Sequence, residues 1–248
     1  MDPLIATAAS GMRSRIETLD VLANNIANAG TTGYKADEAS YNLYFGSGAW
    51  DGYNEGRPAA AEMPVTEKNW TDLSQGTIIP TGNSSDLALA SSGFFTVDTG
   101  KGLMYTRNGH FHIATSGRLE TADGYAVLGN NNLPIVLDPS RGFDVSSSGE
   151  VKQGGAMIAQ LAVADADKLE VTEKRGSGYL RFSPDTKVRP AQSPTILQGN
   201  IEGSNVAPAY TAVKLVNVMR SFEMLQRAVT MGTEMNKKAI EEVARVAS

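Results

Sequence analysis

The sequence predicts an α+β fold in which a helix at each end of the chain pairs with the other and a mainly antiparallel β domain lies between them. Apolar residues recur every seven positions near both termini, and short alternating runs separated by turn dipeptides fill the middle. A third stretch follows neither period. We therefore predict an N-terminal helix and joint over 1–35, an extended connector over 36–80, a β domain over 81–202 and a C-terminal helix within 203–248.

The N-terminal helix is expected from Leu4 to about Asn28 because its apolar residues form two seven-residue rows. Together the rows make a narrow stripe, which suits a helical partner better than a broad globular core. The first row consists of Ile5, Met12, Leu19 and Ile26, and the second of Ala9, Ile16 and Ala23.

The C-terminal helix is expected to begin after a capping tract at 203–205, with Pro208 tolerated in its first turn. It also carries two seven-residue rows, in which Asn236 would select one register and Gly232 would permit close helix approach. An alternative is that both helices cap one globular domain. The residues that we predict to form an assembly seam are Ile5, Met12, Ile16, Leu19, Ile26, Leu215, Val218, Phe222, Leu225, Val229, Asn236 and Val243.

The central region is predicted to be antiparallel because turn dipeptides follow one another at short intervals. Asn108-Gly109, Ser116-Gly117 and Asp123-Gly124 lie seven or eight residues apart, and such pairs favour tight hairpins. Further strand-like runs are PIVLD from Pro134, GFDVSSSGEV from Gly142, AMIAQLAVAD from Ala156, KRGSGYLRFSP and SPTILQG.

Composition excludes several classes of protein. The chain has 248 residues, 41% of them hydrophobic, and a formal charge of −5, which fits a folded domain with a sizeable core. No basic run exceeds two residues, so we expect no nucleic-acid partner. There is no cysteine, which excludes disulfides and thiol ligands. No long apolar stretch and no secretory leader is recognisable, so we expect neither membrane insertion nor a cleaved signal peptide.

Enzymatic and metal-binding interpretations have little support in the sequence. His110 and His112 project to the same side of a strand and could form a metal pair, which carboxylates such as Glu120 or Asp123 would have to complete. We predict instead that they are exposed cross-strand residues, with Phe111 facing the core. No G-x-S-x-G motif occurs, and the glycine-rich pieces lack the strand-loop-helix setting of a phosphate site. We expect no catalytic residue, no metal and no cofactor.

Four segments together resemble one protein family. They are LANNIANAGTTGYK at 22–35, SQGTIIPTGNSSDLALASSGFFTV at 74–97, YTRNGHFHIATSGRLETADGY at 105–125 and IEGSNV at 201–206. In this order they are similar to the motifs of the flagellar axial proteins, the rod and hook family. The matches extend over nearly the whole chain, which makes their combined weight much greater than that of any single motif.

The first of these segments is interpreted as a joint between the terminal helices and the β domain. Its asparagines can bond to carbonyl groups freed at a helix end or to a neighbouring helix, and its glycines allow unusual backbone conformations. Tyr34 could anchor the far side of the turn. An ordinary helix stop is the alternative. The predicted joint residues are Asn24, Asn25, Asn28, Gly30, Thr32, Gly33, Tyr34 and Lys35.

The resemblance implies a structural subunit of the flagellar basal-body rod rather than an enzyme. Such a subunit would leave the cell unfolded through the flagellar type III export apparatus and polymerise helically in the periplasm, with copies of itself and other rod subunits as partners. The start MDPLIATAASG, the short connector and IEGSNVAPA are most similar to the proximal-rod member of the family. A distal-rod protein, or a non-flagellar binding or adhesion protein with a ligand site on its β domain, remains an alternative.

Overall fold

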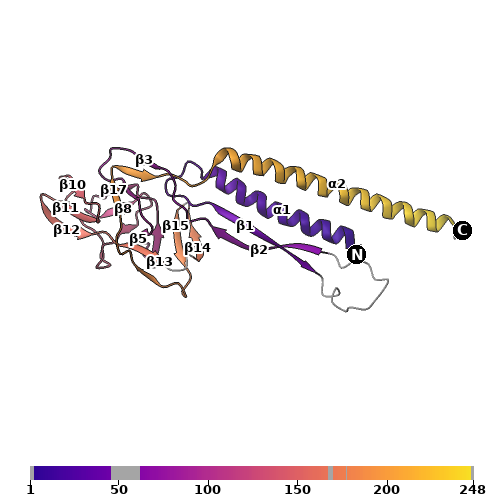
Figure 1. The fold of residues 1–248 in the computed structure, drawn as a ribbon, viewed down its shortest axis with the longest axis horizontal. Coiled ribbons are helices and arrows are strands. Elements are labelled where there is room, and N and C mark those ends of the chain that lie inside the picture. Colours follow the sequence, from indigo (N-terminus) through magenta and orange to yellow (C-terminus); the bar gives the residue numbers. More distant parts are fainter. Residues whose placement is uncertain (1–2, 46–61, 167–169, 177, 247–248) are drawn as a thin grey trace. The chain divides into compact units, whose positions relative to one another are not determined.

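The computed structural model describes residues 3–45, 62–166, 170–176 and 178–246 (Figure 1). The chain divides into two compact units. The helical unit consists of Met1–Ile26, Asp37–Trp70 and Ala207–Ser248, and the β unit consists of Ala27–Ala36 and Thr71–Val206. The predicted boundaries at residues 35, 80 and 202 stay a prediction. Within the single chain, the residues that follow the first helix pack with the β unit.

The helical unit contains both predicted terminal helices. Helix α1 (Pro3–Ala27) and helix α2 (Pro208–Val246) contact one another and run in opposite directions (Figure 1). Pro208 occupies the first helical position, where its missing N–H removes no helical hydrogen bond. The predicted α+β fold with paired terminal helices is therefore confirmed.

The most deeply buried side of α1 differs from the predicted rows. Ala8, Ser14, Leu22 and Asn25 are buried, whereas Ile16 is 47% exposed. Small side chains on the buried side allow a close approach of neighbouring backbone. The other predicted seam residues with described side chains are half-buried, except for the exposed Asn236: Met12, Leu19, Ile26, Leu215, Val218, Phe222, Leu225 and Val229. The side chains of Ile5 and Val243 lie outside the described ones, and burial of the seam in an assembly stays a prediction.

The predicted connector over 36–80 contains regular structure. Strands β1 (Asp37–Phe45) and β2 (Glu62–Thr71) form a two-stranded sheet in the helical unit, and residues 46–61 between them lie outside the described residues. Neither strand has a clear helical or alternating period, and each pairs only with the other. The sequence pattern alone therefore did not indicate this pairing.

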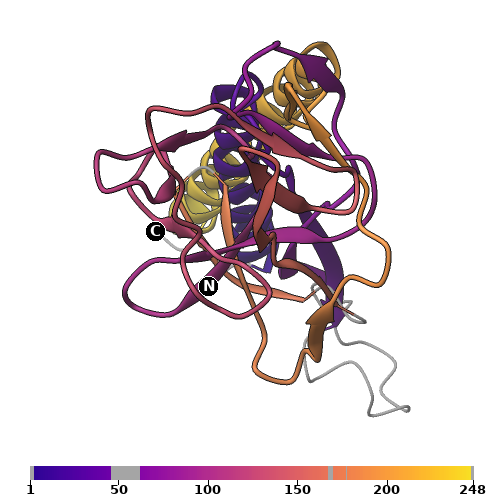
Figure 2. The same ribbon diagram turned by 90° about the vertical axis from the view of Figure 1, so that its left-hand side faces the viewer.

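The β unit holds the remaining strands, which Figure 1 labels and Figure 2 shows from a direction at right angles. Its largest sheet has the order β14-β15-β6-β5-β9-β8-β7, with β13 joining β5 to β16. Every named strand pair in the unit is antiparallel, as predicted. The strands are β3 (Ile78–Pro80), β4 (Leu87–Leu89), β5 (Phe94–Asp98), β6 (Leu103–Thr106), β7 (Phe111–Ile113), β8 (Leu119–Thr121), β9 (Ala126–Val127), β10 (Phe143–Val145), β11 (Glu150–Gln153), β12 (Ala156–Gln160), β13 (Val163–Ala166), β14 (Val171–Arg175), β15 (Tyr179–Phe182), β16 (Val188–Pro190), β17 (Ile196–Gln198) and β18 (Asn200–Glu202).

The core of the β unit is apolar and draws on strands from its whole length. Phe95, Met104, Phe111 and Val151 are at most 1% exposed and belong to one cluster. Phe95 and Phe111 meet edge to face, with ring centroids 5.2 Å apart, a favourable arrangement for aromatic pairs. One apolar core therefore holds together strands that are far apart in the sequence.

Two of the three predicted hairpin turns are confirmed and one is wrong. Ser116-Gly117 connects β7 to its partner β8, and Asp123-Gly124 connects β8 to β9, with positive φ at both glycines. Asn108-Gly109 connects β6 to β7, which do not pair. Gly109 is required there for another reason, because a Cβ would collide with the carbonyl oxygen of Leu87, whose N–H donates to Gly109 O at 3.0 Å.

The remaining strand predictions differ in outcome. PIVLD forms no named strand and makes only isolated bridges, Leu128 with Pro134 and Arg118 with Val136. A short run that is apolar throughout can be buried without pairing continuously, so its pattern was ambiguous. The runs from Gly142 and Ala156, KRGSGYLRFSP and SPTILQG each contain strands, namely β10, β11, β12, β13, β14, β15 and β17.

Candidate functional site

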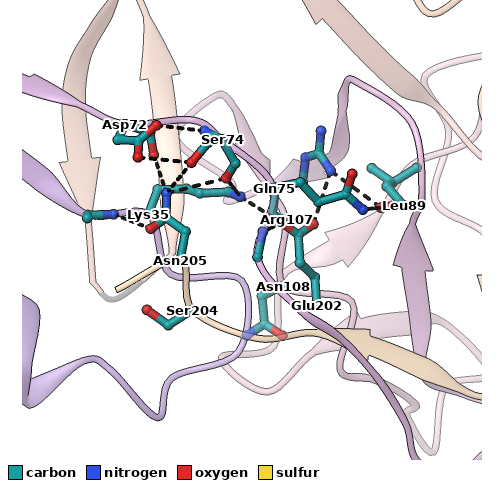
Figure 3. A network of polar contacts seen from close by, with 12 residues as sticks. Lys35, Asp72, Ser74, Gln75, Leu89, Arg107, Asn108, Glu202, Ser204 and Asn205 are labelled. Carbon is teal, nitrogen blue, oxygen red and sulfur yellow. Dashed lines mark hydrogen bonds and ion pairs between the residues drawn. The ribbon is translucent and has the colours of Figure 1, made fainter. Parts of the chain in front are cut away.

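A fully buried carboxylate, that of Glu202, lies at the centre of a polar network in the β unit (Figure 3). Its Oε1 accepts hydrogen bonds from Lys35 Nζ at 2.6 Å and from the backbone N–H of Gly76 at 2.8 Å. Its Oε2 accepts one from Arg107 Nη1 at 3.0 Å. We call Lys35, Gly76, Arg107, Glu202 and Asn205 the junction.

The junction places two cations against one anion in a buried site. Lys35 is 2% exposed and also donates to Ser74 O at 2.5 Å. Burial lowers the pKa of Lys35, and the neighbouring Arg107 lowers it further, while the hydrogen bond and charge of Glu202 oppose both effects. Arg107 lies over the ring of Phe94, with 5.1 Å from Cζ to the ring centroid. Glu202 is therefore the charge on which both cations depend.

Asn205 ties two further segments to the junction. Its Oδ1 accepts from Ala36 N at 2.8 Å, and its Nδ2 donates to Asp72 O at 2.8 Å. The backbone N–H of Asn205 donates to Tyr34 O at 3.3 Å. The expectation that residues 203–205 cap the C-terminal helix is wrong at Asn205, because α2 begins at Pro208. The side-chain amide of Asn205 instead connects separate segments of the chain.

Gly33 allows the chain to pass directly beside the junction. Its N–H donates to Glu202 O at 2.7 Å, its φ is 67°, and a Cβ would collide with the backbone of Arg107 and Asn108. A glycine is thus required for both conformation and space. The same expectation for Gly30 is wrong, because its φ is not positive and a Cβ there would meet nothing within 4 Å.

Tyr34 anchors the turn from its other side. The side chain is 1% exposed, and Lys174 Nζ from β14 lies 4.1 Å from its ring centroid, a cation–π contact. The same Lys174 Nζ donates to Lys35 O at 2.6 Å. Tyr34 and Lys35 are consequently held by a strand that lies about 140 residues further along the chain.

The other predicted joint residues lie outside this network. Asn25 is buried in the helical unit, where its Nδ2 donates to Asp37 O at 2.8 Å and its Oδ1 accepts from Asp37 N at 2.9 Å. Asn28 accepts from Thr31 Oγ1 at 3.2 Å. Asn24 is exposed and Thr32 is half-buried. The asparagine-rich tract therefore bonds to the first residue of strand β1 and within the turn.

All four segments quoted from the sequence contribute to the junction. Lys35 ends the first, Gly76 lies in the second, Arg107 lies in the third, and Glu202 with Asn205 belongs to the fourth. Sequence reasoning singled out Lys35 but missed Arg107 and Glu202 as its partners. Each charged residue lies one or two positions from a glycine in its motif, and this repeated pattern could have indicated that Arg107 and Glu202 are partners of Lys35.

The junction holds chain segments together and offers no reactive group. Every atom described above donates to or accepts from another part of the same unit. His110, on the surface, lies 2.7 Å from Asp86 Oδ1, and His112 lies opposite Glu120. Within the part of the chain that the structure describes, no group of three or more histidine, cysteine, aspartate or glutamate side chains could hold a metal ion. Nor does either described helix have the length and apolarity needed to cross a membrane.

Comparisons with known proteins agree with this reading. The model described as "Flagella basal body rod protein" matches residues 5–35, that of the "Flagellar hook protein FlgE/F/G D1 domain" matches 88–153, and that of the "Flagellar basal body rod FlgEFG protein C-terminal" matches 197–242. The flagellar basal-body rod protein FlgF of Caulobacter vibrioides is 31% identical over 250 residues, which cover 99% of this chain and 100% of the relative. The chain belongs to the flagellar basal-body rod protein family.

Other rod proteins match over similar lengths. FlgF of Rhizobium meliloti is 28% identical, covering 94% of this chain and 95% of the relative. FlgG of Agrobacterium fabrum is 29% identical, covering 93% and 95%. The protein is a FlgF-like structural rod subunit and not an enzyme. The alternative of a non-flagellar binding or adhesion protein is thereby removed.

Proposed function

We propose that this rod subunit is a proximal-rod protein that polymerises through its terminal helices with copies of itself and with neighbouring rod subunits. The observation that carries the proposal is the apolar surface left on both helices. Ile16 on α1 is 47% exposed, and Met224 and Met231 on α2 are 63% and 58% exposed. Rows of large apolar side chains on one helix are typical of surfaces that bind another helix.

In the assembled rod, the terminal helices of the subunits form an inner tube and the β units lie outside it. The junction supports this arrangement. Residues 33–36 lead to α1 and residues 202–205 lead to α2, and the junction binds these two segments to one another and to the rest of the β unit. Torque that turns the rod then passes between helices and β unit through two connected segments instead of one.

The subunit is exported unfolded through the flagellar type III apparatus and folds in the periplasm. The junction supports export before folding. Lys35 and Glu202 are 167 residues apart in sequence, so their buried ion pair requires that both ends of the β unit be brought together by folding. A domain closed in this way would have to unfold again to pass a narrow channel.

Complementation of a strain that lacks its FlgF tests the assembly proposal. Leu19→Asp or Leu225→Asp places a carboxylate in a predicted seam row, where an unpaired buried charge costs several kcal/mol in each subunit. We expect loss of swimming and of the subunit from purified basal bodies, while circular dichroism retains the β signal. Glu17→Gln is the control, since it lies outside the predicted seam and its ion pair with Arg13 is exposed.

Two outcomes would overturn parts of the proposal. Normal motility and incorporation of both aspartate variants would show that the seam is not buried in the rod. Rescue of a strain that lacks FlgG, but not of one that lacks FlgF, would assign the chain to the distal rod instead. Density maps of basal bodies carrying a tagged chain would then locate it directly.

A further inference from the structure

Helix α1 has a second, exposed stripe on the side opposite its buried residues. Ala9, Arg13, Ile16, Asp20 and Ala23 are all exposed and follow one another at spacings of four, three, four and three. This is the spacing of residues that face a partner helix in a coiled coil. The stripe has apolar residues at every second position, and its other two positions carry opposite charges.

Helix α2 has an exposed stripe with the same spacing. Arg220, Met224, Arg227, Met231 and Glu234 are all exposed and recur at four, three, four and three. At 100° per residue they lie on the side of the helix opposite the half-buried row that runs through Leu215, Phe222 and Val229. The two exposed stripes thus have the same alternation of apolar and charged positions.

We propose that the exposed stripe of α1 packs antiparallel against the exposed stripe of α2 from a second copy of this chain, with Ile16 opposite Met231. This inference rests on the proposed function and adds the contact and its register. Within one chain α1 and α2 run in opposite directions (Figure 1). Copies along a rod share one orientation, so α1 of one copy meets α2 of another in the antiparallel sense.

Two of the three apolar positions of the α1 stripe lie opposite methionines in this register, and the third, Ala9, lies opposite Lys238. When Ile16 lies opposite Met231, Ala23 lies opposite Met224 in the next equivalent layer, seven residues along each helix. One layer sets Met224 against the much smaller Ala23, and the other sets Met231 against Ile16, which has about the same volume; the flexible methionines can adapt to both. The exposed methionine surface, 63% and 58% of each side chain, is covered as a result.

The charged positions coincide with opposite signs. Asp20 lies opposite Arg227, and Arg13 lies opposite Glu234. Among the described residues Asp20, Arg227 and Glu234 form no ion pair within their own chain, whereas Arg13 lies 3.4 Å from Glu17 in an exposed pair. Exposed pairs of that kind are weak, so Arg13 is free to turn towards a new carboxylate.

Each neighbouring register exchanges one of the two attractive pairs for a repulsive one. A shift of one heptad in one direction sets Arg13 opposite Arg227 and Asp20 opposite Arg220. A shift in the other direction sets Asp20 opposite Glu234 and Arg13 opposite Glu241. Charged pairs inside a helix interface contribute little net attraction, because removing them from water is costly. Their effect is to select one register, while the apolar layers hold the helices together. The complementarity lies within a single sequence, which is why the partner is a second copy.

Cysteine pairs in assembled rods test the register, because the chain has no cysteine of its own. The double variant Ile16→Cys with Met231→Cys should form disulfide-linked multimers of this chain in purified basal bodies under mild oxidation. Ile16→Cys with Met224→Cys, and Ile16→Cys with Lys238→Cys, represent the two shifted registers and should give at least tenfold less. In a complementary arm, Asp20→Arg and Arg227→Asp should each reduce swimming, and the double variant should restore it.

The readouts separate this inference from the proposed function. The amount of each variant in basal bodies reports whether the chain is a rod subunit, and the disulfide pattern reports the contact. Incorporated variants that form multimers best in a shifted register, or in none of the three, would overturn the inference while leaving the rod assignment intact. A disulfide to a protein of different mass would show that another rod subunit occupies the stripe, and would likewise overturn it.

Discussion

The junction and the exposed helix stripes make opposite uses of side-chain chemistry. At the junction, charged side chains such as Lys35 and Glu202 are buried and bonded to one another inside the β unit. On the helices, apolar side chains such as Met224 and Met231 are exposed. A buried charge is tolerated only when its partners are already in place, whereas an exposed apolar row can await a partner at modest cost. The first region is therefore completed by folding, and we propose that the second is completed by assembly.

The difference predicts where a substitution acts. Changes at the junction should destabilise the isolated chain, and changes on the exposed stripes should leave the isolated chain almost unaltered and prevent incorporation into rods.

Glu202→Gln should have the largest effect. It leaves Lys35 and Arg107 buried without a compensating charge, and breaking a buried ion pair by removing one partner costs about 3–5 kcal/mol. Urea denaturation of the purified chain, followed by circular dichroism, measures the free energy of unfolding. Glu223→Gln, on the exposed surface of α2, is the control and should change it by less than about 0.5 kcal/mol. Equal stability of the two variants would show that Glu202 is not a structural requirement.

Gly33→Ala should come next, with Gly30→Ala as its matched control. A left-handed φ costs a non-glycine residue about 1–2 kcal/mol, and the new Cβ would also displace the backbone at 107–108. Gly30 has open space and an ordinary φ, so its substitution should change the free energy of unfolding by less than about 0.5 kcal/mol. Thermal unfolding of both variants distinguishes them. A similar loss of stability from both substitutions would show that the left-handed φ and the close backbone contact of Gly33 are not the cause.

Lys35→Met should cost less than Glu202→Gln, because Glu202 keeps its bonds to Arg107 and Gly76. We expect a loss of about 1–3 kcal/mol from the hydrogen bonds removed. Because the pKa of Lys35 is lowered on folding, the folded protein releases this proton before the unfolded chain does. Its contribution to stability therefore rises with pH from the lowered value up to the ordinary value of 10.5.

The pH dependence is measured as the difference between wild type and Lys35→Met at pH 7 and at pH 10. That difference should increase in favour of the wild type at the higher pH, since other titrating groups affect both proteins alike. A difference that shrinks would mean that the pKa of Lys35 is raised, and hence that its attraction to Glu202 outweighs the effect of burial.

Much of the fold was predictable because periodicity is a local property. The rows of seven located α1 and α2, and glycine turns such as Ser116-Gly117 located hairpins. The pairing of β1 with β2 was not predictable, since neither strand carries a pattern that names its partner. Asn108-Gly109 misled for a related reason, because a glycine needed for close backbone approach looks the same in sequence as one needed for a turn.

The candidate site was predictable only in part. Lys35 and Tyr34 were singled out because they end a recognisable motif, yet nothing in that motif shows that a carboxylate 167 residues away would meet the lysine. The burial of Glu202 depends on the packing of the complete β unit, which no local pattern records. The seven-residue rows on α1 could be recognised in the sequence, but they do not form its most deeply buried side. That side includes small residues outside the rows, such as Ala8 and Ser14.

Met231→Asp should have the smallest effect on the isolated chain and a complete effect on assembly. The side chain is 58% exposed, so the substitution removes little buried surface and should change the free energy of unfolding by about 0.5 kcal/mol or less. In a rod, the same carboxylate would enter an apolar layer in every copy, where an unpaired charge is strongly unfavourable. Urea denaturation of Met231→Asp should therefore show nearly normal stability while its incorporation into basal bodies fails. For Glu202→Gln, both measurements should show a defect. Gln226→Asp, exposed on a different side of α2, is the matched control and should incorporate normally. If Met231→Asp destabilises the isolated chain as much as Glu202→Gln does, the helix surface is already part of a folded core, and the distinction between a region completed by folding and one completed by assembly fails.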